Sequence, residues 1–405
     1  MLIKPGTFSK DPTMWGLPPG TYVTRTRGTE TRLNDKNWYL DWVSGLGQNL
    51  LGQTPEFLDY LAASIHQGLS PTLTHGLEHL VAEKLAEMLG VNVPGWMGQK
   101  LGVTFAKTGS GATTMAVRLA RAVTGKTYIL TFKDGYHGWG DWTIGRTPPA
   151  HGIIADQKVW DSDNWGDAEK LVAEYEQFPA LPLAAIIFEQ PAIDPPAGWY
   201  SFLRQFANQH NALLIADEVV TGLRYGLGGA CERYDINPDL ICLGKALGNG
   251  MPIAALVGHY VDMEHFARND PVFCSSTTWG EPASLAAANY VLDNFTHRDV
   301  KQIWDTGEAL ITGLRHAGWD VFGHGARSVM QFDREVDRAF FIQGMYNERI
   351  LMNRPNLPNL AHTIGDVTRT IEAAEKLAAL KKYATEAQIQ GAVAGKMPRV
   401  LFDNR

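Results

Sequence analysis

The stretch that decides the fold is LICLGKALGNGMP, residues 240–252, in which a short apolar run ends at Gly244 and Lys245. A second apolar run, ALLIADEV at residues 212–219, ends near Asp217. When parallel strands lie side by side, their carboxyl ends meet at one edge of the sheet, where ligands bind. We therefore expect the amine of Lys245 and the carboxylate of Asp217 to serve one site. The plain alternative for each is a surface lysine or a salt-bridged aspartate at a strand end.

Composition sets limits on the class of protein. Of the 405 residues, 45% are hydrophobic and 20% are charged, which is ordinary for a globular protein with more than one domain. The net charge of −7 argues against nucleic-acid or membrane-surface partners, because phosphate-rich surfaces attract basic proteins. Cys231, Cys242 and Cys274 lack CxxC spacing, so we expect neither disulfides nor a metal site. With no signal-like segment at the N-terminus and no long apolar run, a cytoplasmic location is expected.

The middle of the chain alternates short apolar runs with helical patterns. The expected strands are 102–106, 127–132, 184–189, 212–216, 239–243 and 253–258, and the expected helices are 111–123, 166–177 and 199–210. This alternation predicts an α/β fold with a mostly parallel sheet covered by helices on both faces. We expect a large domain at residues 51–296, a smaller α+β domain at 297–405, and an N-terminal arm at 1–50 that belongs partly to the smaller domain.

A glycine-rich turn follows the first of these strands, in FAKTGSGA at residues 105–112. Gly109 and Gly111 allow the backbone to approach a phosphate group, Ser110 offers a hydroxyl, and the helix that follows offers N–H groups at its start. An ordinary strand-to-helix turn is the alternative, since many such turns are rich in glycine. A P-loop is excluded because position 120, where its first glycine would stand, is alanine.

Two further loops carry polar and aromatic residues. Residues 134–139 read DGYHGW, and Tyr136 could stack on a flat ring, although an aromatic turn is the simpler interpretation. Asp217 and Val219 point to the same face of their strand because side chains alternate. Asp217 could then pair with a ring nitrogen while Val219 packs beneath the ring. Residues 275–282 read SSTTWGEP, whose hydroxyls could bind phosphate or simply cap the helix after them.

Taken together, the lysine, the aspartate, the phosphate turn and the aromatic loop predict a site for pyridoxal 5'-phosphate (PLP). The chain resembles the class III (fold type I) PLP-dependent aminotransferases, and within them the branch similar to glutamate-1-semialdehyde 2,1-aminomutase. The resemblance covers roughly residues 20–380 and rests on Thr108-Gly109-Ser110, Tyr136-His137-Gly138, Asp217 to Gly222, Pro238 to Lys245, and Gly250-Met251-Pro252.

The resemblance implies a role for each site residue. Lys245 would form the Schiff base with PLP, Asp217 would pair with the pyridinium nitrogen, and Val219 and Tyr136 would enclose the ring. Thr277 would reach the phosphate of the neighbouring subunit's cofactor, which implies a homodimer with shared active sites. The remaining cofactor-binding residues implied by the resemblance are Gly109 and Ser110 at the phosphate, with His137 and Glu189 near the cofactor.

The sequence also departs from the family pattern. Gly111 stands where the family usually carries an acid, Glu281 replaces the asparagine of Gly-Asn-Pro, and Gln190 is an extra residue after Glu189. The substrate-carboxylate arginine of true aminomutases has no clear equivalent, and Arg25, Arg27 and Arg32 are candidates only by their location in the N-terminal arm.

The expected function is PLP-dependent transfer of an amino group between an amine or amino-acid donor and a carbonyl acceptor, both small molecules. The alternative is an intramolecular aminomutase, which would need a lid, for example residues 140–158, to retain its intermediate. A more remote alternative is a non-catalytic binding module, which would have no need for Lys245 with Asp217.

Overall fold

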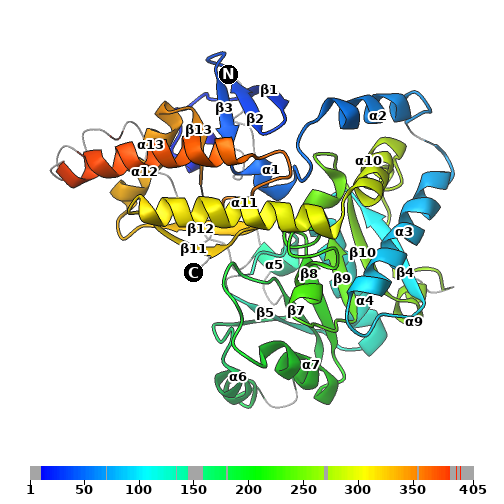
Figure 1. The fold of residues 1–405 in the computed structure, drawn as a ribbon. Helices are drawn as coiled ribbons and strands as arrows, with labels where there is room; N and C mark the ends of the chain where they lie inside the picture. Colours follow the sequence, from blue (N-terminus) through cyan, green and yellow to red (C-terminus); the bar gives the residue numbers. More distant parts are fainter. Residues whose placement is uncertain are drawn as a thin grey trace. The chain divides into compact units, whose positions relative to one another are not determined.

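The structure is a computed structural model that describes residues 11–69, 71–133, 135–144, 158–178, 181–268, 272–353 and 355–383, with Ile389 and Val393. The chain divides after Pro55 and after Val300 into two compact units (Figure 1). One unit is the continuous segment Glu56–Val300. The other combines the chain up to Pro55 with the chain from Lys301 onwards.

Among the described residues, the Glu56–Val300 unit contains a seven-stranded sheet in the order β4-β10-β9-β8-β7-β5-β6. The strands are β4 (Leu101–Ala106), β5 (Tyr128–Phe132), β6 (Val159–Ser162), β7 (Leu183–Phe188), β8 (Leu213–Glu218), β9 (Leu240–Leu243) and β10 (Ala254–His259). Neighbours from β6 to β9 pair in parallel, and β10 is antiparallel to both β4 and β9. The predicted mostly parallel α/β sheet is therefore confirmed.

Helix α4 (Gly109–Thr124) shows how local sequence produces this packing. The hydroxyl of Thr108 caps its first turn, and Gly125 ends it in a left-handed conformation at φ 66°. Its small and apolar residues, including Ala112 and Leu119, are fully buried in one core with Ile187 and the neighbouring strands. The other helices of this unit are α2 (Pro55–Ile65), α3 (Gly76–Asn92), α5 (Asp141–Ile144), α6 (Ala168–Tyr175), α7 (Trp199–Gln209), α8 (Gly229–Arg233), η3 (Lys245–Gly248), α9 (Tyr260–Met263), η4 (Glu264–Phe266) and α10 (Pro282–Asn294).

Strand β6 was missing from the sequence-based expectation. It lies at the edge of the sheet, and its residues alternate between buried and half-buried. Asp161 and Ser162 interrupt the apolar run by which the central strands were recognised. Most of the expected lid, residues 145–157, lies outside the described residues.

The second unit joins the two ends of the chain. Its strands form the sheet β1 (Val23–Arg27), β2 (Glu30–Leu33), β3 (Trp38–Asp41) and β13 (Ile350–Leu351), and the pair β11 (Asp320–His324) and β12 (Arg327–Gln331). Its helices are η2 (Pro12–Trp15), α1 (Ser44–Gly47), α12 (Glu335–Asn347) and α13 (Ile364–Tyr383), while α11 (His297–His316) starts before Lys301. The indole of Trp42 donates a hydrogen bond of 2.8 Å to Thr370, which fastens the N-terminal segment to α13.

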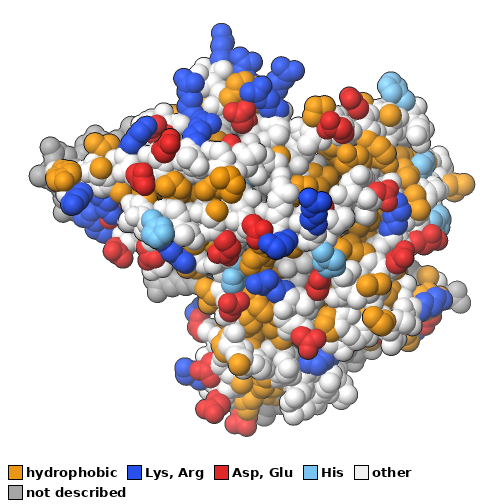
Figure 2. Space-filling view, viewed as in Figure 1, with side chains coloured by type: hydrophobic (Ala, Val, Ile, Leu, Met, Phe, Trp, Pro, Cys, Tyr) orange, Lys and Arg blue, Asp and Glu red, His pale blue; other side chains and the backbone are white. Residues whose placement is uncertain are grey.

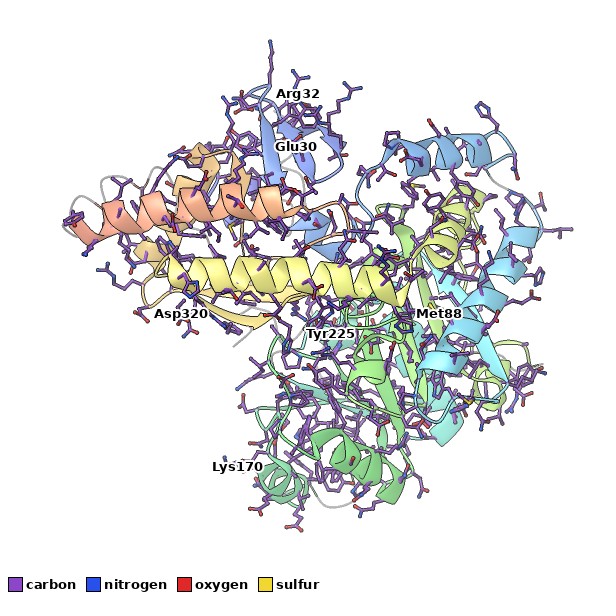
Figure 3. The ribbon with its side chains drawn as sticks, in the orientation of Figure 1. Glu30, Arg32, Met88, Lys170, Tyr225 and Asp320 are labelled. Atoms are coloured by element: carbon purple, nitrogen blue, oxygen red, sulfur yellow. The ribbon has the colours of Figure 1, made fainter. Side chains whose placement is uncertain are left out.

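Basic side chains gather on part of the visible surface. Figure 2 shows Lys and Arg side chains gathered over the β1–β2 hairpin, where Arg32 is labelled in Figure 3. In the part of the chain that the structure describes, none of the helices combines the length and the apolar character needed to cross a bilayer.

Candidate active site

The predicted phosphate turn begins α4 and lies against β8. The Thr108 hydroxyl accepts a hydrogen bond of 3.1 Å from the N–H of Gly111, which holds the turn open at the start of the helix. A Cβ atom on Gly109 would lie 2.7 Å from Cγ1 of Val219, closer than real Cβ atoms come. Position 109 therefore has to be glycine for the turn to approach Val219 this closely.

The aromatic loop after β5 is fastened to the same turn. Oγ of Ser110 accepts a hydrogen bond from the N–H of Trp139 at 3.3 Å, and the Thr113 hydroxyl donates to the carbonyl of His137 at 2.7 Å. Gly138 has a φ of 101°, which side-chain-bearing residues rarely adopt, and a Cβ atom there would meet Ser110. The phosphate turn and the loop of Tyr136 thus form one structure.

His137 and Asp217 form a buried pair at the base of the site. Nδ1 of His137 lies 2.8 Å from Oδ2 of Asp217, and the two side chains are 1% and 2% exposed. An ionised carboxylate only accepts hydrogen bonds, so Nδ1 is the donor to it. Oδ1 of Asp217 accepts from the N–H of Val219 at 3.1 Å. The side chain of His137, which belongs to the aromatic loop after β5, thus contacts the carboxylate of Asp217 on β8.

Lys245 follows β9, the strand that pairs with the strand of Asp217. In this pairing Asp217 lies opposite Cys242, and Cys242 stands three residues before Lys245 in the sequence. Lys245 has a φ of 40°, in the left-handed region that lysine rarely occupies, and such strain concentrates at functional sites. A Cβ atom on the preceding Gly244 would lie 3.3 Å from Val219. Val219 is therefore packed between the phosphate turn and the lysine turn.

Glu189 and Tyr136 meet at the ends of β7 and β5. Oε2 of the buried Glu189 accepts a hydrogen bond of 3.1 Å from the N–H of Tyr136, whose side chain is 41% exposed. Partial burial raises the pKa of Tyr136, and the negative charges of Asp217 and Glu189 raise it further. The extra residue, Gln190, is buried, and its amide donates to the carbonyl of Ile193 at 2.6 Å, so the loop accommodates the insertion.

Two sequence-based candidates lie on other segments of the chain. Thr277 is exposed in the 275–280 loop. The arginines of the arm lie on the β1–β2 hairpin of the other unit. There Arg27 donates to Glu30 at 2.9 Å, and Arg32 donates to the carbonyl of Lys36 at 3.1 Å.

Glu218 is a buried residue for which the sequence suggested no role. Its carboxylate accepts hydrogen bonds from the Thr221 hydroxyl and from the N–H groups of Ala230, at 3.0 Å, and Cys231, at 2.9 Å. Burial raises the pKa of Glu218, although these hydrogen bonds oppose the rise. Glu218 thus folds the segment after β8 back onto the strand that carries Asp217. In the sequence, only the position of Glu218 beside Asp217 could have indicated this structural role.

The residues fit PLP. The buried carboxylate of Asp217 suits a protonated ring nitrogen. The turn at Gly109, where a Cβ atom does not fit, and the hydroxyl of Ser110 suit a phosphate at a helix start. Among the described residues, by contrast, no group of His, Cys, Asp and Glu is arranged to hold a metal ion.

Comparisons with known proteins agree with this chemistry. The sequence pattern of the family "Aminotransferase class-III" matches residues 15–328. A glutamate-1-semialdehyde 2,1-aminomutase of Gemmatimonas aurantiaca is 33% identical over 305 residues, which cover 72% of this chain and 68% of that protein.

Two solved structures share the fold. An omega-transaminase from Sphaerobacter thermophilus has a TM-score of 0.80 at 20% identity and covers 89% of this chain and 91% of its own. A glutamate-1-semialdehyde-aminomutase from Pseudomonas aeruginosa PAO1 has a TM-score of 0.78 at 20% identity, with 90% and 89% covered. At these identities the structural likeness shows the fold alone. The family match covers most of the sequence, and this chain therefore belongs to the class-III aminotransferases, which makes it a PLP-dependent enzyme.

Proposed function

We propose that this enzyme is a transaminase that moves an amino group between an amine or amino-acid donor and a carbonyl acceptor, with Lys245 as its catalytic residue. The observation that carries the proposal is the buried pair of His137 with the β8 residue Asp217, together with the strained turn of Lys245 at the end of the adjacent strand. A binding module would not need a strained lysine beside a buried carboxylate.

The protein's residues divide the work. When bound, PLP supplies an aldehyde that amines condense with and a ring that withdraws electrons from the reacting carbon. Asp217 keeps a proton on the ring nitrogen, and His137 holds that carboxylate in place by donating to Oδ2. Val219 and Tyr136 would enclose the ring, and Ser110 with the start of α4 would hold the phosphate. Lys245 would hold the cofactor and would act as the general acid and base that moves the proton of the reacting substrate carbon.

An aminomutase is the second candidate, because curated relatives such as that of Gemmatimonas aurantiaca carry this name. It would use the same residues and return the amino group to the same molecule. Turnover of a γ-aldehyde amino acid by the purified enzyme, with no external donor or acceptor, would identify this activity. Dependence on an added carbonyl acceptor would support the transaminase.

We also propose a homodimer in the cytoplasm. Thr277 would serve the cofactor phosphate of the partner subunit, a role with which its exposure is compatible. Phe273, four positions before Thr277, is 70% exposed, and Leu58 on α2 is 43% exposed. A protein–protein contact would cover such side chains where they form a contiguous patch. The free thiols of the three cysteines suit a reducing compartment.

Replacing Lys245 by Ala tests the central proposal. We expect Lys245→Ala to lose the visible absorbance of the lysine-linked cofactor and nearly all transamination, a fall of about a thousandfold or more in kcat. The control is Lys170→Ala on α6, labelled in Figure 3, since this lysine is 72% exposed and pairs only with Asp167 on the surface. If the Lys245 variant keeps both the absorbance and the activity, the assignment is wrong.

A further inference from the structure

An ion pair connects the phosphate turn to helix α10. Nζ of Lys107 lies 2.7 Å from Oε2 of Glu281, and the side chains are only 18% and 20% exposed. The partners are 174 positions apart in the sequence, so this contact is made by the fold and not by local structure. Both residues belong to the Glu56–Val300 unit.

Lys107 lies at the start of the turn that is proposed to bind the cofactor phosphate. It lies between Ala106, the last residue of β4, and Thr108, the cap of α4. Its backbone therefore sets the direction in which Gly109 and Ser110 leave the strand. Position 111 is glycine, so this turn brings no carboxylate of its own, and the carboxylate that Lys107 contacts comes from Glu281.

Glu281 is equally well anchored at the other end. Its Oε1 accepts the N–H of Ala283 at 2.7 Å, and its Oε2 accepts the hydroxyl of the fully buried Ser284 at 2.7 Å, so it caps α10. Burial alone would raise the pKa of Glu281, but the hydrogen bonds from Lys107 and Ser284 and the charge of Lys107 lower it overall, which keeps the carboxylate ionised. Glu281 also ends the 275–280 loop that carries Thr277.

We propose that the Lys107–Glu281 pair is a positioning device that holds the phosphate turn and the Thr277 loop in register for binding the cofactor phosphate. The proposal rests on the PLP site and the dimer proposed above. In such a dimer the pair would join the phosphate turn of one subunit's site to the loop that serves the partner's site. It touches neither substrate nor reacting atoms, and its effect is on where the phosphate-binding groups lie.

The test compares cofactors with and without phosphate. Full-length Lys107→Met, Glu281→Gln and the double variant are stripped of cofactor and titrated with PLP and with pyridoxal, following tryptophan fluorescence. Glu281→Gln keeps an oxygen to cap α10. We expect each single variant to raise the Kd for PLP about tenfold, which equals about 1.4 kcal/mol, and to change the Kd for pyridoxal less than about twofold. The double variant should be no weaker than the weaker single variant, because the two residues act as one unit.

The matched control is the ion pair of Arg204 with Asp239, in the same unit. It has the same length, 2.7 Å, and similar exposure, 20% and 22%, and Asp239 also accepts a backbone N–H, that of Leu214. Arg204→Met should lower thermal stability without changing the Kd for PLP. A Kd for PLP that is unchanged in both Lys107→Met and Glu281→Gln overturns the proposal, as does equal weakening of pyridoxal and PLP. If the wild-type protein fails to bind PLP at all, it is the proposed function that fails.

Discussion

Among single residues, His137 and Asp217 form the buried pair that the proposed function places at the ring nitrogen of the cofactor. A buried carboxylate is costly unless its lone pairs are satisfied, and Asp217 is satisfied by the ring of His137 and the N–H of Val219. This arrangement fixes both oxygens of Asp217, and the proposed function assigns this carboxylate to the ring nitrogen of the cofactor. His137 is therefore a positioning residue for Asp217, although the sequence indicated only that it lies near the cofactor.

Replacing His137 by Phe should leave Oδ2 of Asp217 buried without a donor. We expect a loss of about 1–3 kcal/mol in the free energy of unfolding and a fall of about 10- to 100-fold in the rate of the amine half-reaction. His137→Asn is the control, since its amide nitrogen can occupy the place of Nδ1 and should retain most of the rate. The measurements are thermal unfolding and the bleaching of the cofactor band by a donor amine. Wild-type rates in the Phe variant would contradict the role given to His137.

Among elements, helix α12 shows how a terminus is secured by charge. Asp337, in its first turn, is 5% exposed and accepts two hydrogen bonds of 2.9 Å from the guanidinium of Arg334 just before the helix. Lys381 of α13 lies 3.6 Å from the same carboxylate. The Arg334 hydrogen bond lowers the pKa of Asp337 below its ordinary value of 3.8, against the opposing effect of burial. The charge of Asp337 therefore links the start of α12 to α13.

This contact predicts a pH dependence of stability. A carboxylate with a lowered pKa stabilises the fold fully above 3.8, its value when unfolded, and loses this effect as the pH falls through the lowered pKa. We expect Asp337→Asn to unfold about 1 kcal/mol more easily at neutral pH, and the gap to the wild type to narrow below about pH 4. Thermal unfolding of both proteins across that range checks this. A gap that stays constant or widens on acidification would rule the contribution out.

For the whole molecule, the exposed Thr277 raises the question of shared active sites. In a symmetric dimer each site would take Lys245 from one subunit and Thr277 from the other. Sequence resemblance suggested this arrangement, and the exposure of Thr277 is compatible with it.

Hybrid dimers test the sharing directly. When Lys245→Ala and Thr277→Ala subunits are mixed, each hybrid should hold one site with both lesions and one intact site. We expect the hybrids to contribute about a quarter of wild-type activity, since half of the dimers are hybrids with one working site each, and the remaining Thr277→Ala homodimers to add about a quarter of the activity of the unmixed Thr277 variant. As the control, a subunit with both lesions is mixed with wild-type subunits, whose hybrids contain no intact site. The absence of any gain in the first mixture would argue against sharing.

The sequence by itself determined the α/β fold and the chemistry of the site. Apolar runs that end at Asp217 and Lys245 mark neighbouring parallel strands, and the topology of such sheets brings strand ends to one edge. It missed the edge strand β6, whose polar residues hide the apolar pattern. Only the tertiary structure decided that the side chain of His137 contacts Asp217, 80 positions away in the sequence, and that Glu281 forms an ion pair with Lys107. These contacts depend on how loops from distant strands pack in three dimensions, which periodicity and turn chemistry along the chain do not encode.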